Sequence, residues 1–129
     1  MTLKTRVALI REIAAGGSIS YGRTFIAPRA MRVATLSAGY ADGLPKAISN
    51  RDASVLIHGR RCAVLGRVTM DLTMVDVTDV PDVALGDEVV IVGRQGEAQI
   101  LLTEMATRAS TIPWAVLTGI GTRVRRLYL

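Results

Sequence analysis

The sequence is poor in the residues that build disulfides and metal centres. It contains one cysteine and one histidine among 129 residues, so an intramolecular disulfide is excluded. The sequence therefore offers too few ligands for a metal site built from cysteine and histidine, and only one histidine for a Ser-His-Asp triad. Cys62 lies in a strand-like apolar run, which favours a small buried residue, and His58 precedes Gly59 as a turn residue. We therefore expect no metal site.

Long hydrophobic runs are also missing. Half of the residues are hydrophobic, but no run approaches the roughly 18 residues that are needed to span a bilayer. Arg11 and Glu12 interrupt the first apolar segment. We therefore predict no signal peptide, no membrane contact in this segment and a cytoplasmic location.

Aromatic residues are scarce, with one tryptophan, three tyrosines and one phenylalanine. The net charge of +5 and the pI near 10.1 would suit a polyanion. However, the basic residues are scattered, few aromatic rings are present for base stacking, and only Arg123–Arg126 forms a cluster. We expect no nucleic-acid partner, and we interpret this cluster as a solvated or subunit-facing edge.

Short apolar runs separated by turn signals dominate the chain. Leu3–Ala14 fits both a helical and an alternating period, and the glycine-rich turn that follows favours a strand. Further strands are predicted at Met31–Leu36, Ser54–His58, Cys62–Leu65, Val68–Val77, Glu88–Val92 and Ala98–Leu101. This pattern predicts one mainly β domain over residues 1–129 that forms a closed or nearly closed β-barrel.

Helical signals are confined to the end of the chain. Thr103 is the predicted N-cap of a helix over residues 104–109, with Glu104 in its first turn. A second short helix is expected to begin at Pro113 and to end near Gly119 or Gly121. The segment Thr122–Leu129 is predicted to close the chain as a strand. The barrel should therefore carry two short helices near its C-terminus.

Four stretches carry possible chemistry. They are Ser20–Phe25, Gly39–Gly43, Gly66–Asp71 and Thr111–Trp114. The glycines at 39 and 43 lack dinucleotide-fingerprint spacing, and no phosphate-binding loop is present. Asp71 and Asp76 are five apart in a predicted strand and would point to opposite faces, which argues against a two-carboxylate hydrolase. From the residues alone, Tyr21 is either an acid/base group or a packed strand tyrosine.

Several motifs, taken together, resemble the C-terminal domain of alanine racemase. They are Ser20-Tyr21-Gly22, Gly39-Tyr40-Ala41-Asp42-Gly43, Gly66-Arg67 with Met70-Asp71, Gly86-Asp87-Glu88-Val89, and the closing Arg123-Val124-Arg125-Arg126-Leu127-Tyr128. They occur in the order and with the spacing typical of that family. The resemblance covers essentially the whole chain.

The resemblance implies a homodimeric two-domain enzyme that uses pyridoxal 5'-phosphate. An N-terminal (β/α)8 barrel, absent here, would bind the cofactor through a lysine. The substrate would be an amino acid. Tyr21 would be the acid/base residue for the L face of alanine in the partner subunit's site, and the lysine would serve the D face. Such an enzyme interconverts L- and D-alanine and supplies D-alanine for peptidoglycan precursors. We expect this domain alone to be inactive.

The resemblance also implies roles for four residues around Tyr21. The backbone amide of Met70 would help to bind the substrate carboxylate, and Tyr40 would line the substrate entrance. Arg67 and Asp71 would surround the entrance and the rim of the active site. The structural alternatives are a core residue for Met70, a loop anchor for Tyr40, and a local ion pair between Arg67 and Asp71.

Two residues depart from the family pattern. Trp114 stands where the family has a tyrosine that contacts the cofactor phosphate, and Ala115 replaces a glutamate. An indole offers only an N–H donor, so a racemase for serine or for a broader set of amino acids is an alternative. A non-catalytic β-barrel module for binding or assembly is another.

Overall fold

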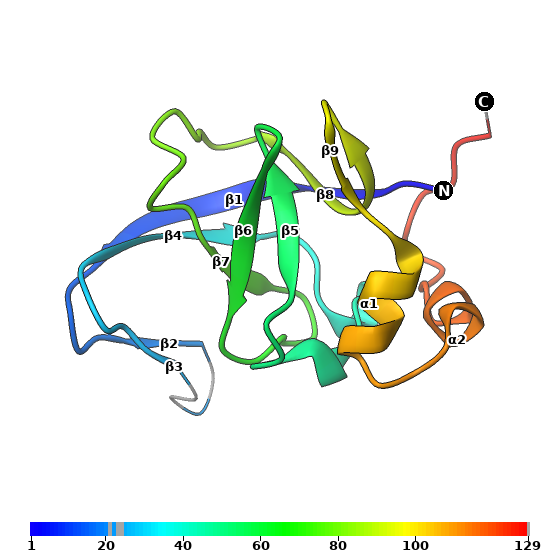
Figure 1. The fold of residues 1–129 in the computed structure, drawn as a ribbon, viewed down its shortest axis with the longest axis horizontal. Coiled ribbons are helices and arrows are strands. Elements are labelled where there is room, and N and C mark those ends of the chain that lie inside the picture. Colours follow the sequence, from blue (N-terminus) through cyan, green and yellow to red (C-terminus); the bar gives the residue numbers. More distant parts are fainter. Residues whose placement is uncertain (21, 23–24, 129) are drawn as a thin grey trace.

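The computed structural model of the chain describes residues 1–20, 22 and 25–128. Strands and loops form most of it, and two short helices lie near the C-terminus (Figure 1). The elements are β1 (Leu3–Ile13), β2 (Ser18–Ile19), β3 (Phe25–Ile26), β4 (Met31–Leu36), the 3-10 helices η2 (Tyr40–Asp42) and η3 (Lys46–Ile48), β5 (Ser54–Ile57), β6 (Arg60–Leu65), β7 (Thr73–Asp76), β8 (Glu88–Gln95), β9 (Ala98–Ile100), α1 (Leu102–Arg108) and α2 (Pro113–Thr118).

Strand β1 closes the sheet into a ring. It pairs antiparallel with β8 through Leu3–Arg6 and with β4 through Val7–Ile13, and each pairing contains a register shift, the irregularity that lets a strand bend. The sheet order is β1-β4-β7-β6-β5-β8-β9, and the additional β1–β8 pairing returns the sheet to its starting strand. This ring is close to the expected closed or nearly closed β-barrel, and the mainly β class is confirmed.

Branched aliphatic side chains form the main core. Val55, Val75 and Val89 are completely buried in this cluster, and β-branched residues pack well on pleated strands. Met105 and Ala106 of α1 belong to the same cluster. The helix is therefore attached to the ring through its apolar face.

The β2–β3 hairpin projects at the left of Figure 1, away from the helices. It has its own small core, in which Ile19 is completely buried beside Met31 and Leu65. Ser20 has a φ of 68°, so the chain leaves the strand conformation directly after β2. The predicted acid/base residue Tyr21 lies outside the described residues.

The connection between β6 and β7 is a turn, so the strand predicted over Val68–Val77 is wrong in its first half. The Thr69 amide donates to the Leu72 carbonyl (3.0 Å), and the Leu72 amide donates to the Thr69 hydroxyl (3.2 Å). A threonine side chain that bonds nearby backbone in this way competes with ladder formation. Met70 and Asp71 are consequently at the tip of a turn.

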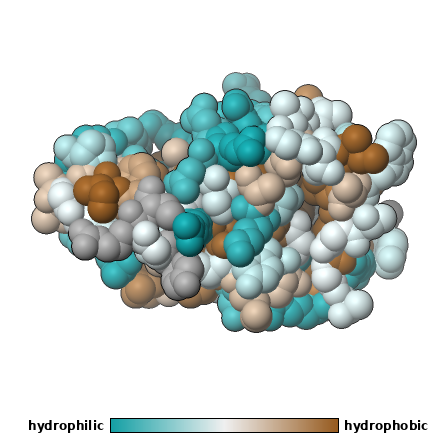
Figure 2. Space-filling view, turned by 90° about the horizontal axis from the view of Figure 1, so that it is seen from below, coloured by the Kyte–Doolittle hydropathy of each residue, from teal (hydrophilic) through white to brown (hydrophobic). Residues whose placement is uncertain are grey.

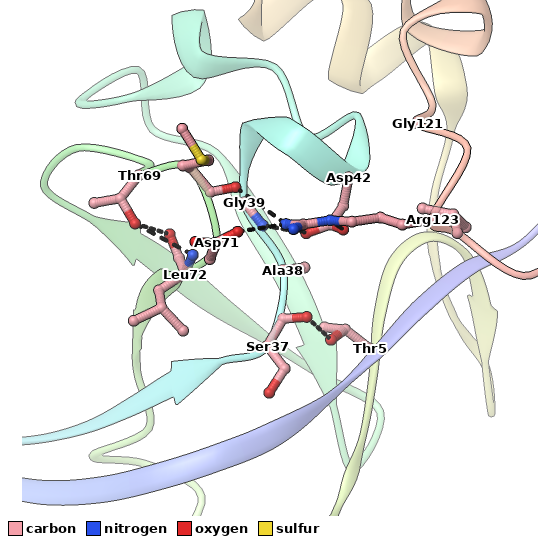
Figure 3. A network of polar contacts seen from close by, with 12 residues as sticks. Thr5, Ser37, Ala38, Gly39, Asp42, Thr69, Asp71, Leu72, Gly121 and Arg123 are labelled. Carbon is pink, nitrogen blue, oxygen red and sulfur yellow. Dashed lines mark hydrogen bonds and ion pairs between the residues drawn. The ribbon is translucent and has the colours of Figure 1, made fainter.

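This turn is held against η2 by a close backbone approach (Figure 3). The amides of Tyr40 and Ala41 donate to the carbonyls of Thr69 (2.9 Å) and Met70 (3.0 Å). A Cβ atom at Gly39, the residue before η2, would lie 2.2 Å from the Thr69 carbonyl oxygen. Glycine is therefore required at position 39 for steric reasons.

The C-terminal segment does not continue the sheet. Thr122–Leu129 was expected to be a strand, but residues 122–128, the part that the structure describes, contain no strand. Instead, the Arg126 guanidinium donates to the carbonyls of Ile120, Gly121 and Val124 at 2.7 to 3.0 Å. These bonds fold the segment back on itself, and the β1–β8 pairing already closes the ring.

The two helices match their predicted positions more closely than their predicted caps. α1 begins at Leu102 with Leu101 as N-cap, so the Thr103 cap is wrong. Glu104 does occupy the first turn, where it accepts hydrogen bonds from Arg61 of β6 at 2.6 and 2.8 Å. α2 begins at Pro113 as predicted. Within the described ranges, no helix is long and apolar enough to cross a membrane.

Cys62 is predicted to be chemically inert in the native protein. Its side chain is buried, with 2% of the residue exposed, and burial together with nearby Asp76 raises the pKa of the thiol to about 11. The reactive thiolate is therefore scarce at neutral pH. We expect Ellman's reagent to label the native protein far more slowly than the denatured protein. Equal labelling rates would contradict this.

Gly39→Ala is predicted to destabilise the domain because its Cβ meets the Thr69 backbone. We expect a loss of roughly 2–4 kcal/mol in the free energy of unfolding, measured with denaturant. Gly96→Ala is the matched control: Gly96 has a φ of 60° and open space around its Cβ position, so only conformational strain of about 1 kcal/mol applies. Equal losses in the two variants would show that the Gly39 approach is not a strict constraint.

Candidate functional site

The residues that flank Tyr21 in sequence lie against Arg67. The Ser20 hydroxyl donates to the Arg67 carbonyl at 2.6 Å, and a Cβ at Gly22 would lie 3.0 Å from the Arg67 Nη1 atom. Gly66, the residue before Arg67, also lies close to Ser20, since a Cβ at position 66 would lie 2.7 Å from the Ser20 Cβ. The fold thus brings both neighbours of Tyr21 to the loop that carries Arg67.

The tip of the Thr69–Leu72 turn presents backbone donors. Among the hydrogen bonds of the described residues, the Met70 and Asp71 amides donate to no protein acceptor. Met70 is 53% exposed, so the alternative of a core residue is wrong. Successive unpaired amides at a turn can bind an anion such as a carboxylate. The geometry therefore fits the backbone role expected for Met70, which stays a prediction.

Tyr40, Arg67 and Met70 line one hollow of about 430 Å³, together with Lys46, Val68 and Thr69. These residues come from the loops after β4 and β6, on two segments that the contact at Gly39 brings together. Three of the residues expected around the substrate thus share one concave surface. On the face seen from below, hydrophobic residues are scattered among hydrophilic ones (Figure 2).

Lys46 is a lining residue that the sequence analysis did not identify. Its Nζ atom lies 5.5 Å from the centre of the Tyr40 ring, a distance typical of cation–π contact. Arg67 supplies a second cation to the same hollow. Two cations beside unpaired amides suit a small anionic ligand. The only sequence signal for Lys46 was its place in the loop that follows Tyr40.

Asp71 is part of an ion-pair network that sequence analysis missed (Figure 3). Arg123 donates from Nη2 to the Asp71 carboxylate at 2.6 Å and from Nε to the Asp42 carboxylate at 2.5 Å. Its Nη2 atom also lies 3.1 Å from the second Asp42 oxygen and 3.5 Å from the Met70 carbonyl oxygen. Among the described residues, the ion-pair partner of Asp71 is thus Arg123 instead of the proposed Arg67.

Asp42 is the less exposed carboxylate of this network, with 18% of its side chain exposed. Burial opposes its ionisation, but the hydrogen bonds from Arg123 and from the Gly39 amide outweigh this effect and lower its pKa. Both carboxylates in turn raise the pKa of Arg123. The pairing of Asp42 with Arg123 therefore favours the charged form of both groups. In the basic cluster that was expected to be a solvated or subunit-facing edge, both Arg123 and Arg126 make specific contacts within this chain.

Trp114 is the second residue of α2 and is 71% exposed. Within the part of the chain that the structure describes, no hydrogen bond involves its indole. Its neighbour Ala115 lines a second hollow of about 320 Å³, which also contacts Tyr40 and Lys46. The structure thus leaves the indole N–H available to a partner but does not bring Trp114 into the hollow that Arg67 and Met70 line.

The described residues contain no group of three or more histidine, cysteine, aspartate or glutamate side chains that could bind a metal ion. The lining of the hollow offers amide donors, two cations and a tyrosine hydroxyl. Such a surface can bind and orient a small carboxylate.

Comparison with known proteins identifies the family. A family model described as "Alanine racemase, C-terminal domain" matches residues 1–128. The alanine racemase of Symbiobacterium thermophilum is 53% identical over 128 residues, which cover 99% of this chain and 34% of that protein. The chain spans about one third of the length of the curated relatives it matches.

Solved structures agree in fold. Alanine racemase from Bacillus anthracis with bound L-Ala-P has a TM-score of 0.91 and 37% identity, covering 99% of this chain and 32% of that chain. Alanine racemase from Bartonella henselae with covalently bound pyridoxal phosphate has a TM-score of 0.91 and 33% identity, covering 99% of this chain and 34% of that chain. The chain therefore belongs to the alanine racemase C-terminal domain family.

Proposed function

We propose that this chain is one domain, residues 1–129, of a pyridoxal-phosphate-dependent alanine racemase. It would complete the active site of the partner subunit in a homodimer, opposite an N-terminal barrel domain that carries the cofactor lysine. The observation that carries the proposal is the family match over nearly the whole chain, combined with the hollow that joins Tyr40, Arg67 and Met70. The match covers 34% of the Symbiobacterium thermophilum relative, so that protein is long enough to contain a barrel domain as well.

Racemisation requires a proton-transfer group on each face of the α-carbon. Tyr21 would give or take the proton on the L face, while the lysine of the barrel domain acts on the D face. A tyrosine with an ordinary pKa near 10 is a poor base at neutral pH, so a cation must lower its pKa. The Arg67 guanidinium beside Gly22 is one such cation from this chain.

The substrate carboxylate would be bound at the Met70 amide. That amide faces no protein acceptor among the described residues, and Lys46 and Arg67 add positive charge to the hollow. Tyr40, which is 39% exposed, would form part of the entrance. These groups orient the amino acid before proton transfer takes place.

Pyridoxal phosphate, when bound, would supply the electron sink that allows the α-proton to leave. From this chain, Trp114 would contact the phosphate, since its exposed indole N–H is a suitable donor. An indole reaches a phosphate oxygen differently from a phenol, so the alternative to an alanine racemase is a racemase for serine or for a broader set of amino acids.

The first test of the proposal joins this domain to a barrel domain with the cofactor lysine. The assembled enzyme should racemise alanine, with serine as the second substrate to be assayed, whereas this domain alone should be inactive. Complex formation without racemisation of any amino acid would favour a non-catalytic module.

Tyr21→Phe in the assembled enzyme should abolish deuterium entry from heavy water into L-alanine and spare the exchange of D-alanine at the lysine. Proton NMR of the α-position measures both exchanges. Tyr128→Phe, which changes a tyrosine that is 93% exposed, is the matched control and should alter neither. If Tyr21→Phe retains both exchanges, Tyr21 has no role in the mechanism.

Trp114→Tyr in the assembled enzyme should strengthen cofactor retention, because it restores a hydroxyl at the phosphate contact. Cofactor absorbance that remains after dialysis measures retention. Leu117→Tyr places a tyrosine elsewhere on α2 and should leave retention unchanged. Unchanged retention in Trp114→Tyr would mean that another donor already satisfies the phosphate.

A further inference from the structure

Asp71 creates an electrostatic problem for the proposed site. Its carboxylate belongs to the residue directly after Met70, whose amide would bind the substrate carboxylate. Two anions so close together repel each other. The side chain of Asp71 is 60% exposed, so it lies at the surface of the same turn. The site therefore needs a counter-ion that neutralises Asp71 without occupying the Met70 amide.

Arg123 is placed to be this counter-ion. Its Nη2 atom lies 2.6 Å from the Asp71 carboxylate, and the same guanidinium pairs with Asp42 on η2. On the Met70 side, Arg123 approaches the carbonyl oxygen at 3.5 Å and leaves the amide unoccupied. One planar cation thus pairs with carboxylates from the two segments that form the hollow.

We propose that Arg123 is a positioning residue for substrate binding, an inference that rests on the function proposed above. It pairs with the Asp71 carboxylate and so reduces its repulsion of the substrate carboxylate. Through Asp42, it also links the Met70 turn to the segment that carries Tyr40. Arg123 need not touch the substrate, because it acts through Asp71 and Asp42.

The C-terminal segment is folded so that Arg123 reaches this point. Arg126 bonds three carbonyls of residues 120–124 and fixes the segment as a compact turn. A Cβ at Gly121 would lie 2.4 Å from the Ala41 carbonyl oxygen, so this segment packs directly on η2. If these residues formed a strand, the turn made by Arg126 and the packing of Gly121 on η2 would both be lost.

The charges around Asp71 support an electrostatic role for Arg123 more than a structural role. Asp71 and Asp42 share Arg123, and Lys46 and Arg67 line the neighbouring hollow. The Arg123 side chain is 50% exposed, and pairs of such exposure contribute little to folding stability. The turn also makes backbone bonds to η2 that do not involve Arg123. Its loss should therefore change substrate affinity more than stability.

The test measures steady-state kinetics in the assembled enzyme. Arg123→Gln should raise the KM for L-alanine about tenfold, with kcat and the melting temperature changed little. Adding Asp71→Asn should restore most of the KM, because the uncompensated charge is then removed. Arg123→Lys should be intermediate, since an ammonium group cannot pair with both carboxylates in the same geometry.

Arg125→Gln is the matched control, because it removes the same charge two residues away. It should leave KM unchanged. The inference is overturned if Arg123→Gln does not change KM, if Arg125→Gln raises KM equally, or if Asp71→Asn gives no recovery. If Arg123→Gln does not fold, Arg123→Lys decides instead: its KM should exceed that of the wild type, and a KM equal to the wild-type value would overturn the role.

A binding experiment separates this inference from the proposed function. Acetate is a simple carboxylate, and titrating it into the assembled protein should shift the NMR signal of the Met70 amide. Arg123→Gln should weaken that binding about tenfold. If the wild type binds acetate in this way but racemises no amino acid, the proposed function fails while the role of Arg123 stands. If Arg123→Gln binds acetate as well as the wild type does, the role of Arg123 fails.

Discussion

The double pairing of β1 is the constraint on which the rest of the structure depends. One strand bonds to β8 along its first half and to β4 along its second half, so a sheet that would otherwise have open edges becomes a ring. Closure buries the branched aliphatic core and pairs β1 with β8 along an edge that would otherwise be open to other chains. It also fixes where the loops after β4 and β6 emerge, and these loops carry the candidate site.

The site then depends on a second, smaller constraint at Gly39. Because this residue lacks a side chain, η2 approaches the Thr69–Leu72 turn closely enough for two backbone hydrogen bonds. Tyr40 and Met70 consequently line one hollow. Arg123 adds a third segment, from the far end of the chain, to the same contact. The candidate site is thus formed entirely from loops that the ring positions.

The sequence correctly predicted the elements whose conformation depends on residues close together in the chain. Met31–Leu36 is a strand with the predicted bounds, and Pro113 begins α2 as its fixed φ favours. His58 and Gly59 both have positive φ and turn β5 into β6. The predictions fail where contacts between residues far apart in the sequence decide the backbone conformation. Residues 68–72 alternate like a strand, but the threonine turn and the contact with Gly39 override that pattern, and Arg126 folds the C-terminal segment away from the predicted strand.

By itself, the sequence determined the mainly β class, the lack of material for disulfides and histidine-rich metal sites, and, through its ordered motifs, a family resemblance that named Tyr21, Tyr40, Arg67, Met70, Asp71 and Trp114. Only the tertiary structure showed that Asp71 pairs with Arg123 and that Lys46 lies beside Tyr40. Arg123 is 52 residues from Asp71 and 81 from Asp42. No local pattern specifies which carboxylates a guanidinium meets at such separations, because closure of the ring decides which distant loops come into contact.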